Sequence, residues 1–83
     1  MKFKGIVTVV LKEGIFDPQG EAVKGSLVSM GFEQVSRVRI GKNIAVELDT
    51  QTQEEASDML DEMARKLLAN PVIETYEIQV VPG

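Results

Sequence analysis

The sequence predicts an α+β fold in which four strands and two helices follow one another in the order strand, helix, strand, strand, helix, strand. Apolar residues alternate with polar residues in the expected strands, and they recur every three or four residues in the expected helices. Turn-forming and helix-ending residues separate these segments. With right-handed crossovers, this order favours one domain over residues 1–83, a ferredoxin-like βαββαβ two-layer sandwich. Its four-stranded antiparallel sheet would have the order 4-1-3-2, with both helices on one face.

The first strand is expected over residues 3–11. Its helix-facing side would carry Phe3, Gly5, Val7, Val9 and Leu11. The other side mixes apolar and polar residues, namely Lys4, Ile6, Thr8 and Val10. An antiparallel sheet often leaves one face in water. A mixed face that is bordered by free sheet edges favours the binding of a partner.

The first helix is expected to begin at Asp17-Pro18, because Asp is a preferred N-cap and proline suits the first helical position. Gly31 is expected to end it. An apolar stripe at helical spacing would pack on the sheet and consists of Val23, Leu27 and Met30. Gly25 costs about 1 kcal/mol relative to alanine inside a helix. It therefore predicts a close approach between this helix and the sheet.

Residues 35–40 and 44–48 are expected to form a hairpin around the loop Gly41-Lys42-Asn43. Successive side chains of a strand point to opposite faces. For one face of the hairpin to pack on the helices, the two residue numbers of each facing pair must therefore add up to an even number. The facing pairs are then Ile40 with Ile44, Val38 with Val46, and Arg37 with Glu47. In this register Arg39 points away from the helices, onto the open face.

The second helix is expected after Thr52, which with Glu55 forms a capping box. Its apolar stripe consists of Ala56, Met59, Leu60, Met63, Ala64, Leu67 and Leu68. Asn70, in a left-handed conformation, and Pro71 would end it. The last strand, residues 73–81, would turn one face toward the helices, with Tyr76, Ile78 and Val80 on it.

The composition excludes several classes of function. The chain has no histidine and no cysteine, so the usual general base, thiol nucleophile and soft metal ligands are missing. We therefore expect no catalysis by this chain alone, no metal and no cofactor. A net charge of −4 disfavours nucleic acid. No apolar run approaches the roughly 20 residues of a membrane span, and no signal peptide is evident, so we expect a cytoplasmic protein without membrane contact.

Three segments, in their order and spacing, carry a resemblance to a known family. They are Asp17-Pro18-Gln19-Gly20, Val38-Arg39-Ile40-Gly41-Lys42, and the stretch Leu-Leu-Ala-Asn-Pro-Val-Ile-Glu over residues 67–74. Through them the chain, over its whole length, resembles PurS, the small subunit of phosphoribosylformylglycinamidine (FGAM) synthase. No single segment is diagnostic, but the combination within a chain of 83 residues is specific.

The resemblance implies a non-catalytic subunit of de novo purine biosynthesis. In that family an ATP-dependent synthetase subunit (PurL) uses ammonia that a glutaminase subunit (PurQ) releases from glutamine. The small subunit forms a homodimer or a dimer of dimers, joins the other two and assists ammonia transfer. ATP and Mg would belong to the synthetase. The candidates for partner contact are Asp17, Arg37, Arg39, Lys42 and Asn70. A cap role alone would also explain Asp17 and Asn70.

Two alternatives share the predicted element order. An ACT-like regulatory module binds amino acids, and it often has Asp, Pro and Gly after its first strand. The order Asp-Pro-Gln-Gly over residues 17–20 departs from its usual pattern. An RNA-recognition motif stacks bases on sheet aromatics. It is disfavoured because Phe3 and Tyr76 are expected to face the helices and because the net charge is negative.

Overall fold

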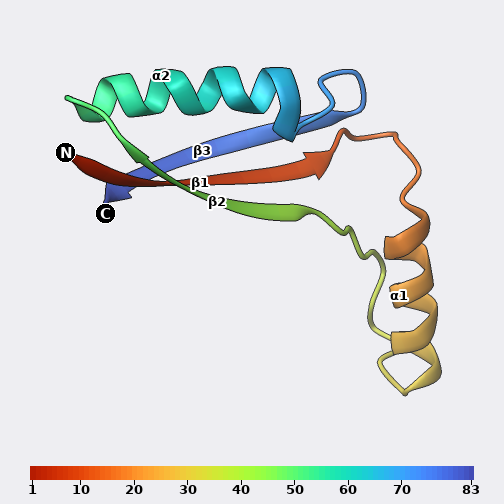
Figure 1. Cartoon of the computed structure of the whole chain (residues 1–83). Coiled ribbons are helices and arrows are strands. Elements are labelled where there is room, and N and C mark those ends of the chain that lie inside the picture. The colour runs from red at the N-terminus through yellow and green to blue at the C-terminus, as the bar shows by residue number, and fades with distance from the viewer.

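The computed structural model describes residues 1–83 and contains a three-stranded sheet, two α-helices and one π-helical turn. In chain order the elements are β1 (Lys2–Leu11), α1 (Pro18–Ser29), β2 (Lys42–Asp49), α2 (Gln53–Met63), η1 (Ala64–Leu68) and β3 (Glu74–Pro82). Figure 1 shows α2 lying along one face of the sheet, while α1 projects away from the sheet beyond the end of β1. No helix of the chain is long and apolar enough to cross a bilayer.

The sheet is antiparallel and has the order β2-β1-β3. Val7 in the central strand faces Ile44 on one side and Ile78 on the other. The predicted fourth, first and third strands lie side by side in that order, as expected. The observed sheet is therefore the predicted sheet without its second strand. The predicted four-stranded sheet is wrong for the single chain, which has three strands.

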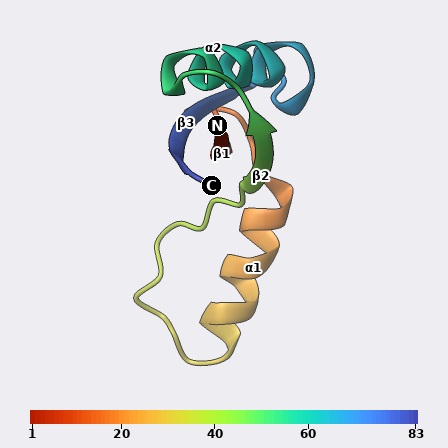
Figure 2. The same cartoon turned by 60° about the vertical axis from the view of Figure 1, so that its left-hand side comes forward.

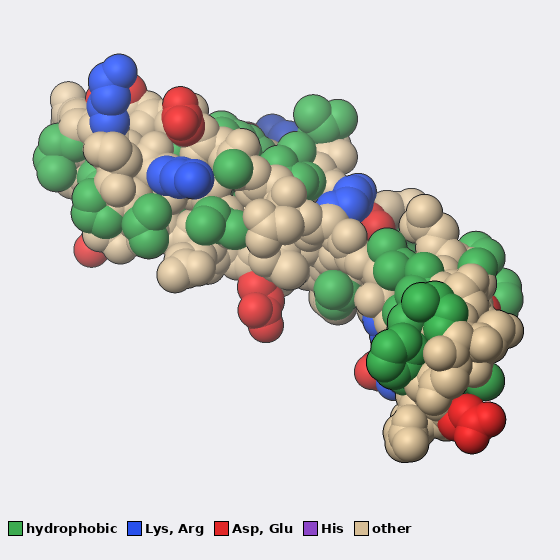
Figure 3. Space-filling model, turned by 90° about the horizontal axis from the view of Figure 1, so that it is seen from below, with side chains coloured by type: hydrophobic (Ala, Val, Ile, Leu, Met, Phe, Trp, Pro, Cys, Tyr) green, Lys and Arg blue, Asp and Glu red, His purple; other side chains and the backbone are tan.

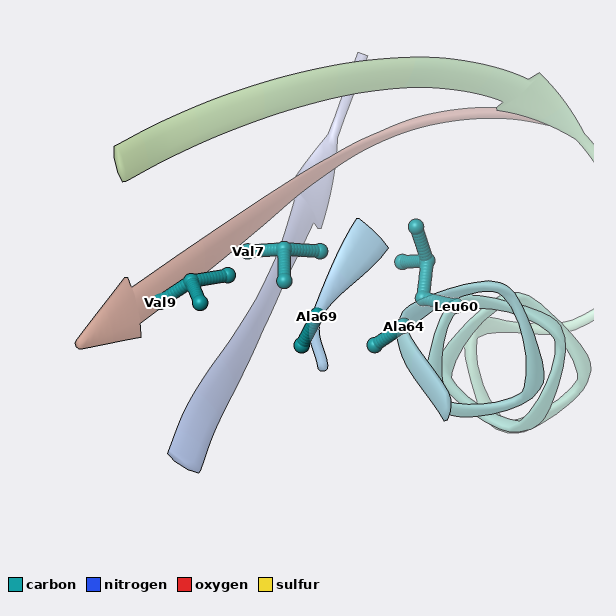
Figure 4. Close-up of a cluster of buried hydrophobic side chains, with 5 residues drawn as sticks. All are labelled: Val7, Val9, Leu60, Ala64 and Ala69. Carbon is teal, nitrogen blue, oxygen red and sulfur yellow. The ribbon is translucent and has the colours of Figure 1, made fainter. Parts of the chain in front are cut away.

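The core lies between α2 and the sheet. Its buried cluster, drawn in Figure 4, consists of Val7, Val9, Leu60, Ala64 and Ala69. Leu60 is fully buried and points at Gly5 on β1, where an added Cβ would overlap the leucine side chain. The glycine therefore lets α2 lie close to the central strand. The predicted inward face of β3 is confirmed, because Tyr76, Ile78 and Val80 all pack against the cluster.

The N-terminus of α2 was predicted correctly, and the helical segment ends at Leu68, close to the predicted Asn70, but its π-helical last turn was not predicted. The hydroxyl of Thr52 accepts a hydrogen bond from the Glu55 N–H, at 3.1 Å. At the other end, η1 closes with a hydrogen bond from the Ala69 N–H to the Ala64 carbonyl, five residues back. Such a turn holds one residue more than an α-helical turn and rotates the residues that follow. Leu67 is consequently 83% exposed rather than part of the inner stripe.

The predicted hairpin is also wrong. Residues 35–41 form no strand, and β2 begins at Lys42, which faces Val9 of β1. Lys42 and Asn43, predicted to lie in a turn, are thus part of a strand. Arg37 does not face Glu47, because its segment forms no strand and its guanidinium pairs with Glu13 instead.

Residues 12–41 form an extension that we call the arm, comprising α1 and its two connections to the sheet. Figure 2 shows α1 on the side of the sheet opposite α2, so the prediction that both helices cover one face is wrong. The radius of gyration is 16.3 Å, whereas a compact domain of this length would have about 12 Å. The arm accounts for this extended shape.

The arm leaves much of its apolar surface in solvent, and hydrophobic side chains are visible on it in Figure 3. Its exposed large hydrophobic residues are Phe16, Val23, Val28, Met30 and Phe32. Met30, from the predicted stripe, is 71% exposed. An added Cβ at Gly25 would meet nothing within 4 Å. The close approach of this glycine to the sheet, predicted from the sequence, does not occur within the chain.

Candidate functional site at the base of the arm

All five predicted partner-contact residues lie around one end of the sheet, where the arm joins it. This end is formed by the last residues of β1 and by the first residues of β2 and β3, since Val9 faces Lys42 and Leu11 faces Glu74. The largest surface hollow, of about 630 Å³, is at the opposite end and is lined by Lys2, Asp49 and their neighbours. The candidate residues therefore share a location, but they do not line that hollow.

Asp17 is the most enclosed of the five, with 7% of its surface exposed. Its Oδ1 accepts a hydrogen bond of 2.8 Å from the Gly20 N–H, which is the predicted N-cap interaction. Its Oδ2 accepts a second one, also of 2.8 Å, from the Ile40 N–H. These bonds favour the ionised form, with the Ile40 bond as the larger cause, and hold the pKa of the Asp17 carboxyl below its usual value.

Arg37 and Arg39 both reach back to the chain that leaves β1. The Arg37 guanidinium forms an exposed ion pair of 2.7 Å with Glu13, and its hydrogen bond lowers the pKa of the Glu13 carboxyl. Arg39 Nη2 donates to the carbonyls of Leu11 and Lys12 at 3.0 and 3.1 Å. The prediction that Arg39 stands on the open face of the sheet is wrong, because the register on which it depended does not exist.

Lys42 and Asn70 stabilise the neighbouring connection between α2 and β3. Lys42 Nζ donates a long hydrogen bond of 3.3 Å to the Leu68 carbonyl. Asn70 Oδ1 accepts one of 3.1 Å from the Val72 N–H, which closes an Asx turn. No residue other than glycine has a positive φ, so the predicted left-handed conformation of Asn70 is wrong.

Sequence reasoning missed two residues of this site. Gly20 is buried, and a Cβ there would overlap the Val38 carbonyl oxygen. Glu13 pairs with Arg37 and lies 3.9 Å from Nη1 of Arg39. The segment Asp-Pro-Gln-Gly did contain Gly20, but a glycine in a first helical turn indicates a close approach only when the opposing backbone is known. Glu13 had no signal in the sequence.

The arrangement serves binding and positioning better than a reaction. The side chains of Asp17, Arg39 and Asn70 hold backbone groups of their own chain, in bonds of 2.8 to 3.1 Å. No group of three or more Asp and Glu side chains is placed to hold a metal ion. Beside these residues, Phe16 is 72% exposed. What the site offers to another molecule is therefore a mixed polar and apolar surface.

Comparison with known proteins gives a consistent family. Residues 4–82 match the family model PurS, described as phosphoribosylformylglycinamidine (FGAM) synthase. The PurS subunit of Bacillus subtilis is 42% identical over 78 residues, which cover 94% of this chain and 92% of that protein. This agreement over nearly the whole length favours the PurS resemblance over an ACT-like module.

The solved structures agree with the family match. The crystal structure of Methanocaldococcus jannaschii PurS, one of the subunits of formylglycinamide ribonucleotide amidotransferase, is 36% identical and superposes with a TM-score of 0.86 over 98% of both chains. A chain in the structure of PurLQS from Thermotoga maritima is 30% identical, with a TM-score of 0.89 over 98% of this chain and 99% of that one. Sequence and fold together show that this chain belongs to the PurS family of FGAM synthase subunits.

Proposed function

We propose that this chain is the small, non-catalytic subunit of an FGAM synthase, which joins an ATP-dependent synthetase to a glutaminase and assists the passage of ammonia between them. The observation that carries the proposal is its likeness to a chain of the PurLQS structure from Thermotoga maritima, with a TM-score of 0.89. The absence of histidine and cysteine fits this role, because the nucleophile that attacks glutamine would belong to another polypeptide. ATP and Mg would bind to the synthetase, and the complex would act in the cytoplasm.

Reconstitution tests this role. The synthetase and glutaminase of the same organism would be purified separately, and FGAM formation would be measured with glutamine or with ammonium salt as the nitrogen source. We expect glutamine-dependent synthesis to require the chain and ammonia-dependent synthesis to proceed without it. Undiminished glutamine-dependent synthesis in the absence of the chain would contradict the bridging role. Turnover by the chain alone would contradict its non-catalytic nature.

We also propose that two copies form a dimer in which the arm of each copy lies against the other. The arm has no core of its own, and Phe16, Met30 and Phe32 are between 52% and 72% exposed. Large exposed apolar patches usually mark sites of interaction. The outer edges of β2 and β3 are also unpaired within the chain, so strand pairing with a second copy is available.

Sedimentation at micromolar concentration tests the dimer. We expect a mass of twice 9.1 kDa or a multiple of it. Met30→Asp and Phe32→Asp place a charge on the arm and should convert the dimer to monomers. Leu67→Asp is the matched control, because Leu67 is 83% exposed but lies outside the arm, and it should leave the dimer intact. A stable monomer for the unmodified chain would exclude the proposal.

A further inference from the structure

Within the arm, α1 is joined to the sheet by two connections, the outgoing segment, residues 12–17, and the returning segment, residues 30–41. Neither Figure 1 nor Figure 2 shows α1 packed along the sheet or along α2. A helix held only by two connections would ordinarily pivot, because loops with few buried contacts are the mobile parts of a fold. The direction of α1 must therefore depend on contacts between these two segments.

The Asp17 carboxylate joins the outgoing segment to the returning one. One oxygen accepts the N–H of Gly20, in the first turn of α1, and the other accepts the N–H of Ile40, just before β2. Both distances are 2.8 Å, as expected for charge-assisted hydrogen bonds. A single side chain thus holds the beginning of the helix against the chain that re-enters the sheet.

Gly20 makes this contact sterically possible. The Val38 carbonyl oxygen occupies the space that a Cβ on residue 20 would need, and Asp17 Oδ2 would be only 2.9 Å from that Cβ. Any larger residue would separate the helix from the returning segment. The close approach occurs at the same junction as the Asp17 hydrogen bonds, because the Gly20 N–H is the donor of one of them.

Arg39 ties the returning segment to the sheet itself. Its guanidinium donates to the carbonyls of Leu11 and Lys12, where β1 ends. The Lys12 N–H in turn donates a hydrogen bond of 2.8 Å to the Ile73 carbonyl, beside β3. Hydrogen bonds therefore connect the start of α1 to the returning segment, the returning segment to the end of β1, and the end of β1 to the residue before β3.

We propose that Asp17, Gly20 and Arg39 form a latch that sets the direction of α1 relative to the sheet within each single chain. The latch presents the arm in one orientation before any partner arrives. Association then loses less conformational freedom than it would with a pivoting arm, because an arm that is already ordered need not be ordered on binding. These three residues act as positioning residues, and this role does not depend on the proposed bridging function.

The direction of the arm can be measured inside one chain. Because the sequence has no cysteine, Ser29→Cys at the far end of α1 and Glu54→Cys on α2 give two unique labelling sites, both exposed. Pulsed electron spin resonance would record the distance between two spin labels. Dilution of the labelled chain into a large excess of unlabelled chain removes distances between copies. The latch predicts one narrow distance distribution for this parent.

Two variants break the latch in different ways. Asp17→Ser keeps a hydroxyl that can cap α1 but has no second oxygen for the Ile40 N–H, and Gly20→Ala inserts the obstructing Cβ. Both should lose the single narrow peak, while circular dichroism and melting of the sheet core stay as in the parent. Glu21→Ser, in the same helical turn, is the matched control and should keep the narrow peak.

The result that overturns the proposal is a narrow, unshifted distribution in both Asp17→Ser and Gly20→Ala. It would mean that the partner copy, or the chain outside these residues, sets the direction of the arm. The distances are measured within one chain, so this test does not assume that a dimer forms. If the distribution broadens in the variants but the parent sediments as a monomer, the latch stands and the dimer proposal fails.

Discussion

The hydroxyl of Tyr76 donates a hydrogen bond of 2.7 Å to Oδ1 of Asp61, which ties β3 to α2. The other oxygen of Asp61 accepts a hydrogen bond from Arg65 Nε at 3.0 Å, one helical turn further along the chain. The carboxylate next to the phenol raises the pKa of Tyr76, while the hydrogen bonds from Tyr76 and Arg65 lower the pKa of Asp61. The contact is thus favourable while the tyrosine is neutral and the aspartate is ionised.

The phenol of Tyr76 should titrate above the usual tyrosine pKa of about 10. Tyr76 is the only tyrosine and the chain has no tryptophan, so the near-ultraviolet absorbance of the phenolate reports this group alone. Asp61→Ala should lower the titration midpoint. Asp58→Ala, on the same helix, should leave it unchanged. A midpoint that does not respond to Asp61→Ala would show that the bond does not persist in solution.

The same pair should give stability a defined dependence on pH. A raised tyrosine pKa contributes stability that is fully present below about pH 10 and is lost as the pH rises through the folded value. The lowered pKa of Asp61 contributes stability that is present above about pH 4 and is lost as the pH falls through the folded value. Denaturant unfolding of Tyr76→Phe and the parent should therefore differ at neutral pH and converge at high pH.

Leu60→Ala should lower the free energy of unfolding by about 2–5 kcal/mol, because it leaves a cavity at a fully buried position. Gly5→Ala should cost about 1–3 kcal/mol, since the added methyl group overlaps the Leu60 side chain. In the Leu60→Ala background Gly5→Ala should cost much less, because the obstructing leucine is gone. Additive losses in urea unfolding would contradict the packing of α2 on β1 described above.

Arg39→Gln should destabilise the chain by about 1.5 kcal/mol or more, because it removes charge-assisted hydrogen bonds to two backbone carbonyls. Arg37→Gln removes the same charge two residues away and breaks only an exposed ion pair with Glu13. It should cost clearly less than Arg39→Gln, because an ion pair in solvent contributes little to stability. Equal unfolding free energies for the two variants would place Arg39 in solvent, as the sequence had suggested.

Gly25→Ala should increase the helical circular dichroism of the dissociated chain, because the site is open and glycine costs about 1 kcal/mol relative to alanine in a helix. It should also raise the dissociation constant of the proposed dimer, if the glycine marks a close approach to a second copy. Ser26→Ala is the control, and sedimentation over a concentration series is the measurement. A tighter dimer in Gly25→Ala would exclude such an approach.

Much of the fold could be predicted from local patterns. Alternation in residues 3–11 and 73–81 identified two strands and their inward faces, and Asp17 and Thr52 identified both helix starts. The hairpin was wrong for a physical reason. Val38 and Ile40 are both half-buried, as the pattern indicated. Periodicity reports that a segment is partly buried, but not whether a neighbouring strand or a helix end covers it.

The helix ends and the candidate site show the same limit of prediction from local sequence patterns. The apolar stripe of α1 indicates a buried face, yet a stripe does not say whether the covering surface belongs to the same chain. At Leu67 the extra residue of η1 shifted the helical phase, which no composition rule reveals. Among the candidates, the cap role of Asp17 was local and was predicted. The contacts from Arg39 to Leu11 and Lys12 join segments far apart in sequence, and only the structure identifies them.

The division between a sheet with its own core and an arm without one has a practical consequence for mutagenesis. The buried hydrophobic cluster lies outside residues 12–41, so the melting temperature of an isolated chain reports chiefly on the sheet and α2. A library sorted by thermal resistance or expression level would accept many changes at Val23, Val28 or Met30. Only a selection for growth without added purines would test those positions for the proposed contact between two copies.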